Sequence, residues 1–143
     1  MSEPLSLQNP LELAEQANRA STGWNRTAGL RFLHISGDEV RAELAVSELH
    51  HQPYGIVHGG VHCSVVETLA SFGAATWLGD QGQVVGVNNS TDFYRAVREG
   101  ALTSTATPVH RGRMQQVWVV ETVDADGRLV ARGQVRLQNL YPR

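Results

Sequence analysis

Residues 52–73, QPYGIVHGGVHCSVVETLASFG, decide the fold, because they predict a turn that runs into one long helix. From about residue 59 to residue 78 nearly every side chain is apolar or small, so this helix has no wide polar face for water. A helix that is apolar almost all round is a buried helix. Glu67 is its one carboxylate, and an ionised carboxylate is costly there unless it is hydrogen-bonded or lines a cavity.

Small or polar residues recur three and four positions from Glu67, at Gly60, Ser64 and Ser71. On a helix these positions share one side with the carboxylate. We therefore expect the stripe to form the wall of a pocket that is open beside Glu67.

The predicted helix starts at His58-Gly59-Gly60, with no Ser, Thr, Asp or Asn at the usual capping position. We expect its first N–H groups to be free for a ligand at the positive end of the helix dipole. Free donors that polarise a carbonyl, together with a carboxylate, are what acyl transfer needs. A structural reading fits this stretch equally well: the glycines would permit close packing, and Glu67 would accept a backbone hydrogen bond.

The chain has 143 residues and no internal repeat, which indicates one domain that is large enough to form its own hydrophobic core. A net charge of −2 gives no electrostatic support for a nucleic-acid partner. The single cysteine, Cys63, fits a small core residue. We find no signal-peptide pattern and no uninterrupted apolar span, so we expect a cytoplasmic protein that does not contact membranes.

Other segments supply one helix and six strands around the central helix. Asn9-Pro10 introduces an amphipathic helix over residues 10–20, and residues 21–28 are expected to form a loop. A hairpin is predicted from residues 30–35 and 39–46, and four strands joined by short turns from residues 84–93, 102–109, 117–123 and 129–138. This order predicts an α+β fold with one antiparallel sheet wrapped around one long helix. Because the sheet leaves one side of the helix and its own edges uncovered, we expect a homodimer, paired further into a homotetramer.

Three motifs occur in order along the chain. The first comprises Gln52, His58-Gly59, Glu67 and Ser71; the second runs from Val85-Gly86-Val87-Asn88-Asn89 to Arg95; the third covers residues 108–113 and 126–131. In this order they resemble the hot-dog-fold acyl-CoA thioesterases, in the branch of the phenylacetate-pathway and menaquinone-pathway enzymes. The resemblance spans about residues 24–140. It implies a hot-dog domain over residues 24–143, preceded by an extension over residues 1–23 with a short helix.

The resemblance also implies roles for individual residues. Glu67 would attack the thioester or activate a water, and the Gly59 N–H would polarise the thioester carbonyl. Gln52 and His58 would place that carbonyl, and Ser71 would help to hold the water. In the family these groups come from two subunits across a dimer interface. The implied reaction is hydrolysis of an acyl-CoA with an aryl or medium-chain acyl group.

Substrate contacts are expected from Gly60, Ser64 and Phe93. Some menaquinone-branch members carry a His where this chain has Phe93, which weakens the case for a hydroxylated aromatic acyl group. Coenzyme A carries phosphates that Arg binds by paired hydrogen bonds. We therefore expect nucleotide contacts from Arg95 and from the turn formed by His110, Arg111, Gly112 and Arg113, although such a turn also fits an ordinary solvated hairpin.

Two other interpretations fit parts of the sequence. His58 and His62 have the spacing of paired zinc ligands, but the glycines between them leave no general base, so we expect neither a metal nor a cofactor. His62 is expected to reach an interface or solvent, and His50 and His51 to lie in a loop. The alternative function is a non-catalytic acyl-CoA-binding domain, acting as a sensor or carrier; Glu67 favours the enzyme, because such a domain has no use for a buried carboxylate.

Overall fold

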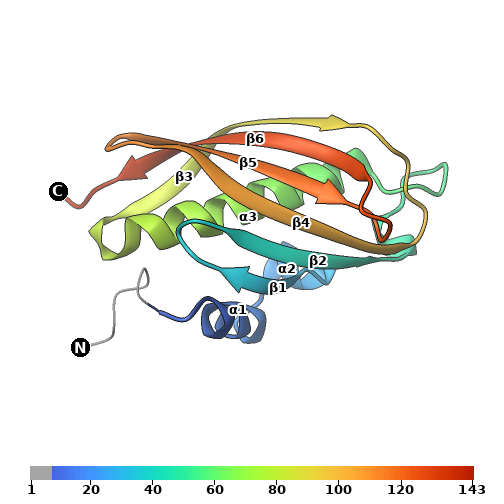
Figure 1. Cartoon of the computed structure of the whole chain (residues 1–143), viewed down its shortest axis with the longest axis horizontal. Helices are drawn as coiled ribbons and strands as arrows, with labels where there is room; N and C mark the ends of the chain where they lie inside the picture. Colours follow the sequence, from blue (N-terminus) through green and yellow to red (C-terminus); the bar gives the residue numbers. More distant parts are fainter. Residues whose placement is uncertain (1–7) are drawn as a thin grey trace.

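A computed structural model describes residues 8–143 as one antiparallel sheet with a long helix lying along one face (Figure 1). Residues 1–7 of the expected N-terminal extension lie outside the described residues. The helical segments are α1 (Pro10–Arg19), α2 (Gly23–Ala28), η2 (Glu48–His50), α3 (Gly59–Leu78) and η3 (Gly79–Gln81). The strands are β1 (Arg31–Ile35), β2 (Val40–Val46), β3 (Gln83–Phe93), β4 (Gly100–Arg111), β5 (Gln115–Val123) and β6 (Leu129–Leu140).

The strands are arranged in the order β1-β2-β4-β5-β6-β3, and each pair of neighbours is antiparallel. The predicted β1–β2 hairpin is confirmed. The short turns predicted between the last four strands would place β3 beside β4. This is wrong, because β3 pairs with β6 and forms the far edge of the sheet. Residues 94–99 make the crossing, held by bonds from Tyr94 N to Val130 O and from Val57 N to Val97 O, both 2.8 Å.

The core lies between α3 and the concave face of the sheet. Val66, Leu69 and Ala70 of α3 are fully buried, as is Trp118 of β5. Gly73 lets the helix approach closely, since a Cβ there would lie 2.6 Å from Trp118 Cζ3. The predicted α+β class, with a sheet around one buried helix, is confirmed.

Helix α1 is part of the same core. Asn9 caps it, with Oδ1 accepting a hydrogen bond from Leu11 N at 2.9 Å, and Pro10 follows at the first helical position as predicted. The Asn18 side chain donates to Phe32 O at 2.9 Å and accepts from Phe32 N at 2.8 Å, so it fixes α1 against β1. Figure 1 shows α1 beside β1, at the opposite edge of the sheet from β3.

Residues 23–28 form helix α2, so the predicted loop is wrong at this point. So short a helix has little stability of its own, which is why sequence pattern missed it. Tertiary contacts support it: Asn25 Oδ1 accepts a hydrogen bond from Thr68 Oγ1 of α3 at 3.2 Å. Gly29, with φ of 75°, then ends the helix in a left-handed conformation that favours glycine.

Candidate active site

Glu67 lies half-buried on α3, against edge strand β3. Its Oε2 accepts a hydrogen bond from Asn89 Nδ2 at 3.1 Å, and the same amide donates to Cys63 O at 3.0 Å. Strand β3 is bulged between Gly86 and Asn88, and a Cβ at Gly86 would overlap Glu67 Oε1. Asn89 and Gly86 therefore determine where the carboxylate lies, a role that sequence analysis did not assign to either residue.

The expected stripe is the open side of α3. Gly60 is exposed, and Ser64, Glu67 and Ser71 are half-buried, whereas Val66 and Leu69 on the opposite side are fully buried. The Ser64 hydroxyl donates to Val61 O within the helix at 2.8 Å. The carboxylate thus faces away from the core.

The start of α3 differs from expectation, because His58 caps it. His58 Nδ1 accepts the Gly60 N–H at 2.7 Å, so that donor is not free for a ligand. Within residues 8–143 no group accepts the Gly59 N–H, which leaves it available. An imidazole whose Nδ1 accepts in this way is neutral and carries its hydrogen on Nε2, where it can donate.

Gln52 is held in the turn that precedes α3. Its side-chain Oε1 accepts from Tyr54 N, and its carbonyl accepts from Gly55 N at 2.9 Å. Arg98 stabilises the turn by donating to Tyr54 O at 3.1 Å. With its oxygen engaged, the Gln52 amide presents N–H donors, so Gln52, His58 and Gly59 each have a donor left for a ligand.

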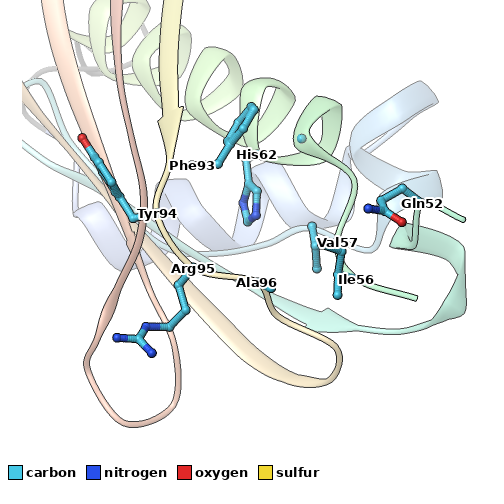
Figure 2. A pocket seen from close by; sticks show the side chains of 9 residues that line it. Gln52, Ile56, Val57, His62, Phe93, Tyr94, Arg95 and Ala96 are labelled. Carbon is cyan, nitrogen blue, oxygen red and sulfur yellow. The ribbon is translucent and has the colours of Figure 1, made fainter. Parts of the chain in front are cut away.

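Two cavities flank the start of α3. The first is about 340 Å³ and is shown in Figure 2; its lining residues are Gln52, Ile56, Val57, Gly59, His62, Phe93, Tyr94, Arg95 and Ala96. The Phe93 ring packs on the helix start, because a Cβ at Gly59 would lie 2.7 Å from Phe93 Cε2. The second cavity is about 480 Å³; its lining residues are Trp24, Leu49, His50, His51, His58, Gly60, Val61 and Ser64.

The histidines occupy different surroundings. His58 lines the second cavity and His62 the first, so the pair does not converge. In the described part of the chain no group of three or more His, Cys, Asp or Glu side chains is placed to hold a metal ion. His50 is buried rather than in an open loop, and its ring bonds Ala28 O at 2.7 Å. His51 bonds Arg98 O at 2.7 Å.

His62 does not reach solvent, which was one of the two surroundings expected for it; the other, an interface between subunits, stays a prediction. Its side chain is only 4% exposed, and its ring centroid lies 5.8 Å from that of Phe93. Burial lowers the pKa of His62 below its ordinary value, which favours the neutral ring. The signal that sequence analysis overlooked is helical spacing, since His62 lies four and seven residues before the buried Val66 and Leu69.

The basic turn lies at the other end of the sheet, between β4 and β5. Asn139 holds its backbone by donating to Gly112 O at 3.0 Å and Arg113 O at 3.1 Å. A Cβ at Gly112 would lie 2.6 Å from His110 Nε2 and 3.1 Å from Gln115 O, so a larger residue there would require the exposed His110 ring to move. The predicted turn residues are therefore together, but distant from Phe93 and the start of α3 in the same chain.

The arginines of the expected nucleotide site differ in their partners. Arg111 donates to Gly37 O at 2.6 Å and Asp38 Oδ1 at 2.7 Å, and its guanidinium lies 5.7 Å from the centre of the Trp77 ring. It is therefore engaged within the chain. Arg95 and Arg113 are exposed, and neither forms an ion pair with any described residue.

Gly59 and Glu67 are too far apart to act on the same thioester within one chain. They are separated by eight residues of continuous α-helix, which corresponds to about 12 Å along its axis. A carbonyl bonded to the Gly59 N–H therefore lies well away from the Glu67 carboxylate of the same helix.

Comparison with known proteins identifies the family. The family model described as Thioesterase superfamily matches residues 54–131, more than half of the chain. The chain belongs to the thioesterase superfamily. It is thus a thioester-hydrolysing enzyme with the hot-dog fold. No helix in residues 8–143 is both long and apolar enough to cross a membrane.

Individual relatives agree with this assignment. Rv1847 of Mycobacterium tuberculosis, provisionally named an esterase, is 51% identical over 80% of this chain and 84% of its own. The 1,4-dihydroxy-2-naphthoyl-CoA hydrolase of Escherichia coli K12 is 33% identical over 70% of this chain and 74% of its own. The crystal structure of AziG from S. sahachiroi is 58% identical, has a TM-score of 0.83, and matches over 85% of this chain and 98% of that one.

Proposed function

We propose that this thioesterase hydrolyses acyl-CoA thioesters with an aryl or medium-chain acyl group, in an active site shared by two subunits of a homodimer. The observation that carries the proposal is the separation of the free Gly59 N–H from the Glu67 carboxylate along one helix. A second copy of the chain, running in the opposite direction, can bring one subunit's Gly59 close to the other's Glu67.

Strand β3 is the surface that suits this dimer. It is an edge strand with unpaired backbone groups, and its Val85, Val87 and Phe93 are 45%, 48% and 53% exposed. Exposed apolar edges favour pairing with another strand. Antiparallel pairing of β3 with its copy extends the sheet and sets the two α3 helices antiparallel. Pairing of two such dimers gives the proposed homotetramer.

In the proposed reaction, the thioester carbonyl oxygen accepts a hydrogen bond from the Gly59 N–H. The Gln52 amide and His58 Nε2–H are further donors that help to position this carbonyl. Glu67 of the partner subunit either takes a proton from a water that attacks the carbonyl carbon or attacks that carbon itself. Asn89 orients this carboxylate, and Ser71 helps to hold the water. The carbon–sulfur bond breaks, and the CoA sulfur leaves as a thiolate that is protonated to the free thiol. Where water attacks, this step releases the free acid directly; where Glu67 attacks, it leaves an acyl anhydride on Glu67, which water then hydrolyses to the free acid and the Glu67 carboxylate.

For the nucleotide of coenzyme A, we propose contacts from the turn at His110, Arg111, Gly112 and Arg113. In the antiparallel dimer, this turn of one subunit approaches the Phe93 end of the other, because β3 runs from one end of the sheet to the other. Arg113 and Arg95 are the cations that can contact phosphate, since Arg111 already has its partners within the chain. Arg111 contributes by holding the turn in place.

Free-thiol release over a panel of aryl, medium-chain and long-chain acyl-CoAs tests the proposal. We expect release with at least one aryl or medium-chain ester, at a rate that saturates with substrate. Binding of acyl-CoA without any release of thiol would instead support the sensor or carrier function.

A further inference from the structure

The Asn89 side chain, which contacts the Glu67 carboxylate, is itself held from both ends. Its Nδ2 donates to Cys63 O at 3.0 Å and to Glu67 Oε2 at 3.1 Å, which uses both of its N–H groups. Its Oδ1 accepts a hydrogen bond from Thr91 Oγ1 at 2.7 Å. The amide is therefore fixed by α3 at its nitrogen and by its own strand, β3, at its oxygen.

The fold makes room for the Thr91 hydroxyl beside this amide. Residues 89 and 91 are alternate positions of β3, so their side chains lie on the same face of the sheet. The residue opposite Thr91 on β6 is Gly133, where a Cβ would overlap Thr91 Oγ1 and lie 2.6 Å from Val66 Cγ1. Glycine at this position thus leaves a space between β6 and α3 that the hydroxyl occupies. Thr91 is half-buried there, and its branched side chain has few rotamers, so the hydroxyl has a defined direction.

We propose that Thr91 is a positioning residue of the reaction, which acts through Asn89 on the Glu67 carboxylate. The inference rests on the proposed function, since it takes Glu67 as the reacting group. Thr91 itself touches neither the substrate nor the reacting atoms.

An asparagine amide needs such a partner because rotation about its last side-chain bond is soft. With Thr91 donating to Oδ1, the Nδ2 hydrogens point toward α3 and hold the carboxylate. A hydrogen bond to the oxygen also polarises the amide, which makes its N–H groups better donors. Without the hydroxyl, the amide can turn away, and the Glu67 carboxylate is held in its reacting position for less of the time.

Thr91→Val tests the inference, because it removes the hydroxyl and keeps the shape of the side chain. Thiol release is measured with benzoyl-CoA or octanoyl-CoA, whichever the parent hydrolyses faster. We expect kcat to fall by about 3- to 10-fold, the effect of one neutral hydrogen bond, with KM nearly unchanged. Thr91→Ser keeps the hydroxyl and should recover most of the parental kcat. The half-buried Thr105 of β4 supplies the matched control Thr105→Val, which should behave as the parent does.

A double variant distinguishes action through Asn89 from a general structural effect. Asn89→Ala should lower kcat, and Thr91→Val should add no further loss in that background, because both changes act through one group. An equal loss from Thr91→Val with and without Asn89 would overturn the inference. A parental kcat in Thr91→Val, beside a slow Glu67→Gln, would overturn it and leave the proposed function intact. A parental kcat in Glu67→Gln would overturn both.

The side-chain amide of Asn89 gives a readout that does not depend on hydrolysis. In ¹H–¹⁵N spectra its pair of signals is the one missing from Asn89→Ala. We expect Thr91→Val to shift this pair and to speed the exchange of its hydrogens with water, and Thr91→Ser to leave both close to the parent. An Asn89 amide whose signals and exchange are unchanged in Thr91→Val would overturn the inference, whatever the activity.

Discussion

Asn89 donates a hydrogen bond to Glu67 across the contact between β3 and α3, with Nδ2 3.1 Å from Oε2. The bond holds a carboxylate on the open side of an otherwise buried helix. Glu67→Gln preserves the shape of the side chain but removes its basicity and negative charge. We expect kcat to fall by roughly 100-fold or more, the usual range for loss of a positioned acid–base group, with unfolding unchanged. The exposed Glu12 of α1 offers the control Glu12→Gln. If Glu67→Gln keeps kcat within a few-fold of the parent, the carboxylate has a structural role and not a catalytic one.

Gly86→Ala tests whether the β3 bulge positions the carboxylate. The added methyl group would overlap Glu67 Oε1, so the carboxylate must move although no catalytic group is removed. We expect a clear loss of kcat, measured by thiol release, and little change with Ser90→Ala at an exposed position of the same strand. The double variant Gly86→Ala/Glu67→Gln should be no slower than Glu67→Gln alone, because both changes act through one group. Additive losses would mean that Gly86 acts through something else.

Arg111 and Arg113 should give opposite results although they lie two residues apart. Arg111→Ala removes the bonds to Gly37 and Asp38 and the contact with Trp77, so we expect a loss of about 1 kcal/mol in the free energy of unfolding. Arg113→Ala should leave stability unchanged and raise KM for acyl-CoA without lowering kcat, since the nucleotide lies far from the reacting carbon. Thermal unfolding and steady-state kinetics distinguish the two. An unchanged KM for Arg113→Ala would show that the nucleotide of coenzyme A does not bind at this turn.

The buried His62 predicts a dependence of stability on pH. Burial lowers its pKa in the folded protein, whereas in the unfolded chain it keeps its ordinary value of about 6.5. As pH falls below that value the unfolded chain binds the proton first, so stability decreases, by at most about 1.4 kcal/mol per pH unit from this group. Denaturant unfolding of the parent and His62→Gln at pH 7.5 and pH 5.5 measures the contribution. The parent should lose more stability than the variant, and equal losses would contradict the expected shift.

Features that depend on local sequence could be predicted from it. Signals within a few residues of each other predict three of these features: the long, almost continuously apolar helix α3, the Asn9-Pro10 start of α1, and the hairpin of β1 and β2. Glu67 could be selected as a candidate because a lone carboxylate in an apolar helix conflicts with its surroundings. Such a conflict between a residue and its local pattern is typical of functional sites.

Features that depend on distant partners could not be predicted in this way. Strand β3 pairs with β6 at the edge, and nothing within β3 specifies that neighbour. The cap at His58 depends on the rotamer that brings its Nδ1 to the Gly60 N–H. The partners of Arg111 lie at Gly37 and Asp38, more than seventy residues away in the sequence. Asn89 appears in the sequence as one polar residue among several, and only the packing of β3 on α3 brings it to Glu67.

The central claim is that Gly59 of one subunit and Glu67 of the other act on the same thioester. Gly59→Val places a branched side chain where Phe93 already packs, so it should abolish thiol release, and Glu67→Gln should lower kcat by roughly 100-fold or more in its own homodimer. A heterodimer of the two variants contains one site with both changes and one site with neither. Chains carrying the two changes, mixed in equal amounts through co-expression or refolding, should therefore recover about a quarter of the parental activity, and the purified heterodimer about half. A purified heterodimer that is no more active than either variant alone would contradict a site shared between subunits.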